Sequence, residues 1–212
     1  MADLEFFFDP VCPFAWITSR WVTEVQQLRD YDVQWRFISL RIINENVVAD
    51  WYDDAYKANH RAGTFGLRVA DAVRLSNGNA AVAAIYTATG TALHVHKRRA
   101  DLVADPVAFM AEMLQIAGLP VEHAAAALDE SHDAYLRAET ELAFSRTGRD
   151  VGTPILTFHP DQADEGSFFG PVISSIPRGA AATRLWDAIE VIATTSGLAE
   201  LKRSNRAALD FT

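Results

Sequence analysis

The pattern of apolar and polar positions near the N-terminus predicts two strands separated by a helix. Residues 4–8 form an almost wholly apolar run that ends at an Asp-Pro pair, which suits a buried strand. Residues 33–38 alternate apolar with polar side chains, which is typical of a second strand. Between them, residues 16–28 place their large apolar side chains on one helical face. This order predicts a βαβ unit, whose crossover favours a parallel pair of strands.

The pattern changes between residues 51 and 147, where alanine is abundant and helical periodicity dominates. Pro106 and Pro120 stand where helices start, and Gly118 where one stops. We expect helices over residues 53–63, 67–76, 80–94, 106–117, 121–129 and 130–147.

Strand character returns in residues 155–158 and 167–169, and a helix is expected over residues 179–195. The complete order is β-α-β, then a helical block, then β-β-α. This order predicts an α/β protein with a thioredoxin-like fold and an inserted helical domain. We expect residues 1–50 and 148–212 to form the thioredoxin-like domain and residues 51–147 to form the all-helical insert.

Composition narrows the class of protein. Half of the 212 residues are hydrophobic and 22% are charged, which is enough apolar surface for a sizeable core. The net charge of −9 argues against a nucleic-acid partner or an anionic membrane surface. No window holds ~18 uncharged apolar residues, and the N-terminus lacks the pattern of a signal peptide. We therefore expect a cytoplasmic protein with no membrane and no nucleic-acid partner.

The single cysteine, Cys12, stands between the first strand and the first helix. A thiol at a helix start faces unsatisfied backbone N–H groups and the positive end of the helix dipole, and both favour the nucleophilic thiolate. A lone cysteine is more often a small buried hydrophobe, but this position favours a reactive thiol with a lowered pKa. Pro13 is tolerated at the first helical position, and Ala15 stands where the second cysteine of a Cys-x-x-Cys motif would be. The residues that we expect to bind a thiol or substrate beside Cys12 are Pro13, Phe14, Ala15 and Trp16.

A second candidate segment is Gly152-Thr153-Pro154, directly before the third strand. A proline leading into a strand is ordinarily an edge or turn device. In thioredoxin-like folds, however, a cis proline at this place faces the active-site cysteine, and the residue before it offers backbone groups to a bound thiol. We therefore expect a cis Thr153–Pro154 bond and a binding role for all three residues.

Three further polar residues are weaker candidates. Asn44 and Asn46 follow the second strand, at the end where parallel sheets bind ligands, although capping of the next helices explains them equally well. Arg178 stands at a helix start, where a cation is disfavoured, and so is a candidate for binding a ligand carboxylate. The six histidines show no ligand spacing, since His94 and His96 do not share a helix face, and we expect no metal.

Four blocks of sequence, residues 9–21, 39–46, 151–154 and 168–179, resemble the DsbA-like mycothiol-dependent nitroreductase family of actinobacteria. The resemblance implies a DsbA-like thioredoxin fold with a helical insertion and a Cys-Pro-x-Cys motif that works with the cytoplasmic thiol mycothiol. By position, Cys12 matches the nucleophile, Pro154 the cis proline, and Ala15 the missing second cysteine. The resemblance further implies mycothiol or another low-molecular-weight thiol as cosubstrate, an electrophilic or disulfide substrate, and a plausible homodimer.

More distant relatives leave alternatives open. The kappa-class glutathione transferases and the 2-hydroxychromene-2-carboxylate isomerases share the inserted-helix layout but carry serine at the matching position. Our interpretation is a thiol-dependent oxidoreductase in which Cys12 alone forms a mixed disulfide, because no second cysteine can expel the partner. The alternatives are a thiol-dependent transferase or isomerase, and a non-catalytic thiol-binding or redox-sensing protein.

Overall fold

The computed structural model describes residues 2–211, and its centre is a four-stranded sheet in the order β2-β1-β3-β4. Strand β1 (Leu4–Phe8) runs parallel to β2 (Val33–Phe37), as the βαβ pattern predicted. Strand β3 (Ile155–Phe158) is antiparallel to β1, and β4 (Gly166–Phe169) is antiparallel to β3. This mixed topology is that of a thioredoxin-like α/β fold.

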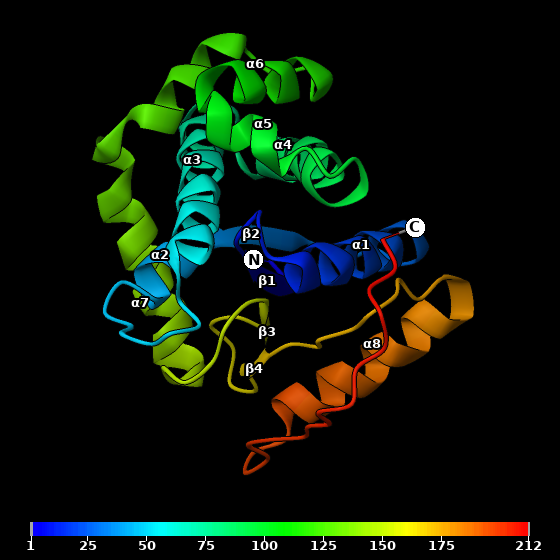
Figure 1. The fold of residues 1–212 in the computed structure, drawn as a ribbon. Helices are drawn as coiled ribbons and strands as arrows, with labels where there is room; N and C mark the ends of the chain where they lie inside the picture. The colour runs from blue at the N-terminus through cyan, green and yellow to red at the C-terminus, as the bar shows by residue number, and fades with distance from the viewer. Residues whose placement is uncertain (1, 212) are drawn as a thin grey trace.

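Helices cover both faces of the sheet (Figure 1). On one face, α1 (Pro13–Leu28) and α8 (Gly179–Thr194) pack together, with the rings of Trp21 and Trp186 5.3 Å apart. On the other face, Ala143 of α7 (Asp133–Thr147) packs against Phe7 of β1. Strand β1 is buried throughout, Glu5 included, because its alternate side chains point to opposite faces of a sheet that is covered on both sides.

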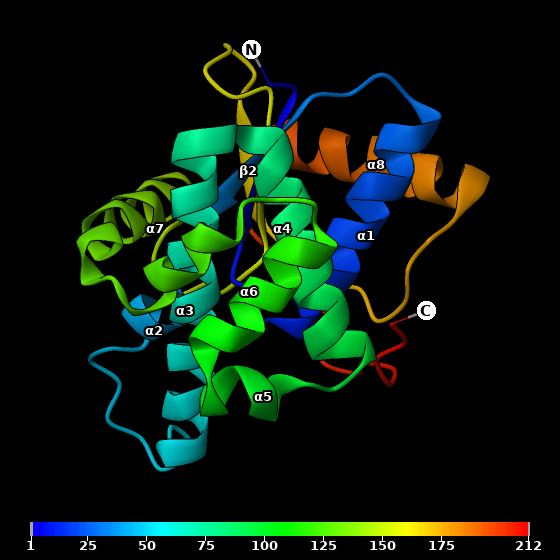
Figure 2. The same cartoon turned by 90° about the horizontal axis from the view of Figure 1, so that it is seen from above.

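The chain between β2 and β3 is helical, and Figure 2 shows these helices gathered beside the sheet and α1. They are α2 (Leu40–Ile43), α3 (Asp54–Asn77), α4 (Asn79–Gly90), a π-helical segment η1 (Thr91–Val95), α5 (Arg99–Ala104), α6 (Pro106–Ile116), the 3₁₀ segments η2 (Val121–Leu128) and η3 (Glu130–His132), and α7. No helix within residues 2–211 is both long and apolar enough to cross a bilayer.

Several predicted helix boundaries were wrong. Residues 53–63 and 67–76 belong to the one continuous helix α3, and the helix expected over 80–94 ends at Gly90 and continues as the π-helical segment. The short helices α2 and α5 were not predicted, since each is too brief to show a periodic pattern.

Three glycines of α3 and α4 allow close packing against the loop that carries Cys12 and against the start of α1. A Cβ atom on Gly63 would lie 2.4 Å from Oδ1 of Asp9, and one on Gly66 would lie 3.0 Å from Cγ of Pro10. On α4, a Cβ atom at Gly90 would lie 2.1 Å from Cε3 of Trp16. At these glycines the backbone of α3 and α4 therefore lies directly against residues at and before the start of α1.

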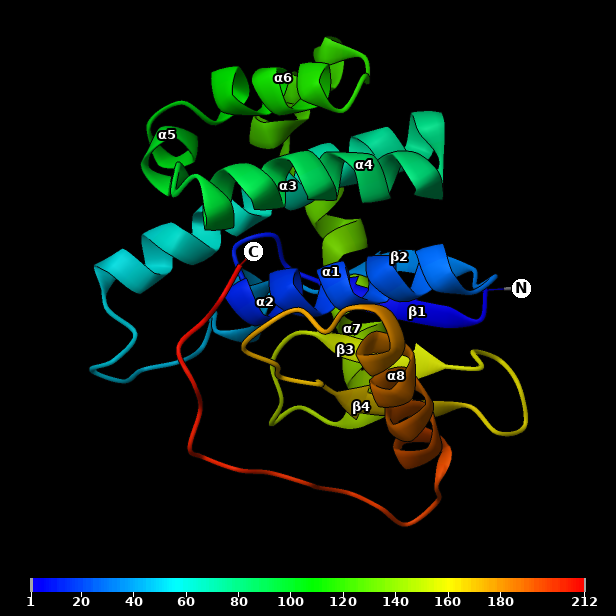
Figure 3. The same ribbon diagram turned by 90° about the vertical axis from the view of Figure 1, so that its right-hand side faces the viewer.

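After α8 the chain forms no further helix or strand up to residue 211. This C-terminal segment is largely exposed over residues 200–208 and returns to the N-terminal end of α1, as the red trace of Figure 3 shows. Leu209 and Phe211 are half-buried there against the core. The sequence showed no periodic pattern that would have placed this segment.

We predict that Gly90→Ala destabilises the protein, because the added methyl group overlaps the rigid indole of Trp16. Overpacking of this kind typically costs ~1–3 kcal/mol. The helix preference of alanine over glycine acts in the opposite direction, so a lower midpoint in thermal or urea unfolding reports the clash itself. An unchanged or raised midpoint would contradict the close packing of α4 on α1.

Candidate active site

Cys12 is the N-cap residue of α1, and its thiol bridges two distant segments of the chain. Its Sγ accepts a hydrogen bond from the backbone N–H of Ala15 at 3.5 Å, and its S–H donates to the carbonyl of Thr153 at 3.3 Å. The Thr153–Pro154 peptide bond is cis, as expected. The structure thus brings Cys12, Ala15, Thr153 and Pro154 together, and one hydrogen bond joins Cys12 to Thr153, which stands 141 positions later in the chain.

The loop before β3 is held from both sides. The hydroxyl of Thr153 donates to the carbonyl of Phe7 on β1 at 3.3 Å, and the carbonyl of Pro154 accepts from Gly170 N–H at 2.9 Å. Gly152 precedes this pair and is half-buried, with only the ring of Phe169 near its Cα. These bonds fix the Thr153 carbonyl in the direction of the Cys12 thiol.

Asp9 organises the turn that carries Cys12, although the sequence showed it only as the end of a strand. Its carboxylate is fully buried, at 0% exposure, and accepts the N–H of Val11 at 3.1 Å and the N–H of Leu40 at 2.8 Å. Its carbonyl accepts the N–H of Cys12 at 3.0 Å. The absent side chain of Gly63 makes the room for this carboxylate. Asp9 therefore joins the Cys12 turn, the start of α2 and the middle of α3.

Burial dominates the electrostatics of the site. It raises the pKa of the Cys12 thiol to about 12, and the nearby Asp9 acts in the same direction. The N–H groups of Ala15 and Phe14 and the charge of Arg99 oppose this rise but do not offset it. The expectation of a lowered Cys12 pKa was therefore wrong for this closed arrangement: with 6% of the residue exposed, desolvation of the thiolate outweighs the helix terminus.

Two basic residues of the helical segment contact the turn directly before Cys12, and sequence reasoning missed both in this role. Nε2 of His94 lies 2.8 Å from the carbonyl of Pro10, and burial lowers the pKa of His94 to about 4, so the neutral ring donates from Nε2. Arg99 donates to the carbonyl of Val11 at 3.2 Å. His94 belongs to the π-helical segment, a distortion often found at functional sites.

The residues that follow Cys12 differ in accessibility. Ala15 and Trp16 are buried, and the Trp16 ring lies nearly parallel to that of His94 at 5.9 Å. Pro13 and Phe14 are half-buried, and the guanidinium of Arg206 lies 5.3 Å from the centre of the Phe14 ring. Of the four predicted binding residues next to Cys12, Pro13 and Phe14 are therefore the partly exposed ones.

The three weaker candidates do not contact the thiol. Asn44 caps α2 by donating to the carbonyl of Leu40 at 2.8 Å, and Asn46 is exposed beyond it. Arg178 pairs with Glu24 at 3.0 Å. Glu24 stands twelve positions after Cys12 on α1, which places it ~18 Å along the helix axis. The structure therefore does not bring Arg178 to Cys12.

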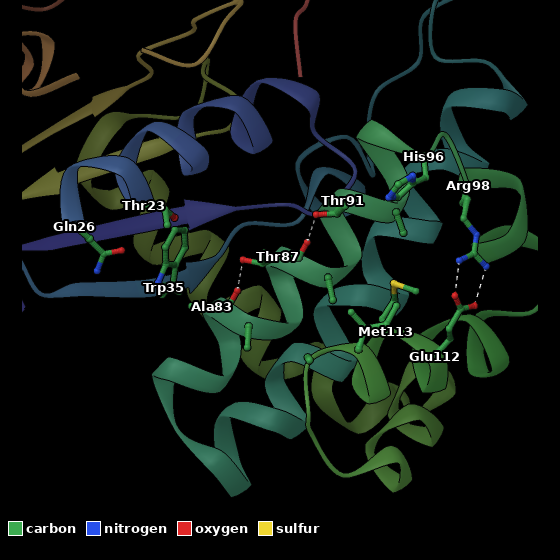
Figure 4. A pocket seen from close by; sticks show the side chains of 15 residues that line it. Thr23, Gln26, Trp35, Ala83, Thr87, Thr91, His96, Arg98, Glu112 and Met113 are labelled. Atoms are coloured by element: carbon green, nitrogen blue, oxygen red, sulfur yellow. Dashed lines mark hydrogen bonds and ion pairs between the residues drawn. The ribbon is translucent and has the colours of Figure 1, made fainter. Parts of the chain in front are cut away.

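A groove of about 910 Å³ lies elsewhere, between α1, α4 and α6, and none of the predicted site residues lines it (Figure 4). Its polar groups are largely engaged: Thr87 and Thr91 donate to carbonyls of their own helix turns, and Arg98 pairs with Glu112 at 2.6 Å. Within residues 2–211 no group of three His, Cys, Asp or Glu side chains is placed to hold a metal ion.

A cysteine at the first helix of a thioredoxin-like fold, facing a cis proline, defines a thiol-dependent oxidoreductase of the DsbA type. Comparison with known sequences gives the family. The chain belongs to the Rv2466c-like family, described as mycothiol-dependent nitroreductase Rv2466c, whose profile matches residues 11–203. It is also 31% identical over 205 residues to the uncharacterized protein Rv2286c of Mycobacterium tuberculosis, a match that covers 96% of this chain and 82% of that protein.

Solved structures support the fold. The cytosolic disulfide reductase DsbM from Pseudomonas aeruginosa, solved with GSH, superposes with a TM-score of 0.55 at 16% identity, over 78% of this chain and 88% of that chain. A protein from Nitrosomonas europaea, proposed to be a protein disulfide isomerase, gives a TM-score of 0.56 at 14% identity, over 87% and 95% of the two chains. At such identities the likeness establishes the shared architecture.

We predict that Asp9 makes the stability of the protein depend on pH. Burial raises its pKa from 3.8 to about 7, so between these values the native state holds a proton that the unfolded state has lost. This contribution to stability is complete below about pH 4 and is lost as the pH rises through about 7. The free energy of unfolding of the wild type, measured with urea, should therefore fall over this range relative to that of Asp9→Asn.

Asp30→Asn serves as the matched control, because Asp30 is exposed and has no part in the site. The difference in free energy of unfolding between the wild type and Asp30→Asn should not change in this way between pH 4 and 7. A constant difference between wild type and Asp9→Asn over the same range would contradict the assignment of this proton to Asp9.

Proposed function

We propose that this chain is a monothiol oxidoreductase in which Cys12 forms a mixed disulfide with a low-molecular-weight thiol or with its substrate, mycothiol being the thiol of its family. One observation carries the proposal: the only cysteine caps α1 and faces the Thr153 carbonyl beside a cis proline. The place of a second cysteine is taken by the buried Ala15, so an outside thiol must complete each cycle. A lone cysteine and a small-thiol cosubstrate fit a reducing, cytoplasmic compartment.

The proposed chemistry has three exchange steps. The Cys12 S–H loses its proton to solvent, and the thiolate attacks one sulfur of a substrate disulfide, forming a mixed disulfide and releasing the other sulfur as a thiolate. A mycothiol thiolate then attacks the substrate-derived sulfur, which releases Cys12 and leaves the substrate joined to mycothiol. A second mycothiol completes the reduction by forming oxidised mycothiol. Two mycothiol molecules thus supply the two electrons.

The residues of this chain have defined parts in the cycle. The Ala15 N–H already contacts Sγ and would remain as a donor to the thiolate. The Thr153 carbonyl accepts the S–H of the resting thiol and would be free to accept an N–H from the bound thiol once Cys12 has reacted. Because burial raises the pKa of Cys12, the site must open before the first step, and exposure would then let the helix N-terminus favour the thiolate.

We predict that the purified chain forms a single adduct when incubated with oxidised mycothiol or, separately, oxidised glutathione, as measured by intact mass. The adduct should form only at Cys12, so Cys12→Ser should show none, and reduced mycothiol should reverse it. Turnover of a disulfide substrate with mycothiol should fall to background in Cys12→Ser, because serine cannot form the mixed disulfide.

The other outcomes separate the alternative functions. Activity that survives in Cys12→Ser would indicate a transferase or isomerase that binds the cofactor thiol without a covalent bond. A stoichiometric adduct without turnover would indicate a redox sensor. A Cys12 that reacts only in denaturant would make it a buried structural thiol and overturn the proposed function.

A further inference from the structure

The C-terminal segment ends against residues that flank the Cys12 turn. The ring of Phe211 lies nearly parallel to that of His94, with centroids 5.8 Å apart and an angle of 23° between the planes. Nζ of Lys97 lies 4.1 Å from the centre of the Phe211 ring. His94 in turn contacts the Pro10 carbonyl, two residues before Cys12, and its ring also lies nearly parallel to that of Trp16. The Phe211 ring is thus linked, through His94, to the turn that precedes Cys12.

The C-terminal segment is an irregular stretch of chain that lies largely on the surface. The backbone N–H of Asp210 donates to the carbonyl of Ser174 at 2.7 Å, and Arg206 contacts the Phe14 ring. Leu209 and Phe211 are only half-buried, and the segment belongs to no helix or strand. Short terminal segments anchored in this way detach locally without unfolding of the domain. Phe211 can therefore leave its place while the His94 and Lys97 side chains stay.

The surface beneath Phe211 has the chemistry of a site for aromatic rings. Burial lowers the pKa of His94, so the imidazole presents a neutral aromatic face. Rings prefer offset parallel or edge-on partners at such separations, and a cation over a ring adds attraction. Lys97 adds a positive charge that would also attract an anionic substituent on the ring. A ligand that carries an aromatic ring and one negative charge would therefore match both His94 and Lys97.

We propose that Phe211 is an internal occupant of an aromatic subsite that His94 and Lys97 form against the turn preceding Cys12, and that a planar aromatic substrate with an anionic substituent displaces it. The inference rests on the proposed function of Cys12 as the reacting thiol and names the substrate class that reaches it. Binding of such a substrate would also expose Phe14 and the start of α1, because the segment that carries Phe211 also carries Arg206, which lies over the Phe14 ring.

The test compares thiol reagents that differ in aromatic character. Wild type, Phe211→Ala and Leu201→Ala would react with 5,5′-dithiobis(2-nitrobenzoate), with 2-hydroxyethyl disulfide and with iodoacetamide at neutral pH. The aromatic disulfide forms a mixed disulfide between Cys12 and one thionitrobenzoate group and releases the other thionitrobenzoate, which is followed by its absorbance. Leu201 is the matched control, because it lies in the same segment and is 77% exposed.

We expect Phe211→Ala to raise the rate with the aromatic disulfide by about tenfold and the rates with the two non-aromatic reagents by clearly less. Leu201→Ala should behave as wild type. Adding Lys97→Met to Phe211→Ala should reduce the gain with the anionic aromatic reagent, and circular dichroism should show that every variant stays folded. Equal acceleration of all three reagents, or none, would overturn the subsite.

A binding measurement separates failure of the subsite from failure of the proposed function. In Cys12→Ser, where no exchange occurs, 2-nitrobenzoate should bind more tightly once Phe211 is replaced by alanine, read out by tryptophan fluorescence. Such binding supports the subsite whether or not Cys12 is a catalyst. No binding, together with a Cys12 that resists iodoacetamide in every folded variant, would overturn both proposals.

Discussion

The buried carboxylate of Asp9 holds together the chain segments on which the candidate site depends. It accepts backbone N–H groups from the Cys12 turn and from the start of α2, and α3 lies against it at a glycine. A buried carboxyl group is costly unless its hydrogen bonds are satisfied, so this one constrains every segment that touches it. The position of Cys12 at the start of α1 follows from the turn that Asp9 closes.

The same burial sets the state of the thiol. A helix N-terminus stabilises a thiolate, whereas removal from water destabilises it, and here removal from water has the larger effect. The closed arrangement therefore stores Cys12 in its protonated form, with the S–H bonded to the Thr153 carbonyl. Exposure of Cys12 to water would remove the cost of desolvation, and the backbone N–H groups at the helix terminus would then lower the pKa of the thiol.

The helical segment between β2 and β3 contributes to the site as well as covering it. Through Gly63, Gly66 and Gly90 it approaches the Cys12 turn, and through His94 and Arg99 it binds the two carbonyls before the cysteine. The predicted helices ended at residue 63 and resumed at residue 67, whereas Gly63 and Gly66 lie inside the continuous helix α3 and are contact points. Periodicity alone does not distinguish a helix end from a contact point, because a glycine at either place interrupts the pattern of apolar side chains.

The sequence by itself determined the strands, the parallel βαβ unit, the start of α1 at Cys12 and the cis bond before Pro154, all of which are encoded by contiguous residues and confirmed in the structure. Tertiary structure alone decided the burial of Cys12, the role of Asp9, the pairing of Arg178 with Glu24 and the seat of Phe211. The physical reason is that backbone conformation responds to neighbours in the chain, whereas desolvation depends on atoms brought from distant segments. A pKa is the sum of both effects, and a sequence pattern reveals only the first.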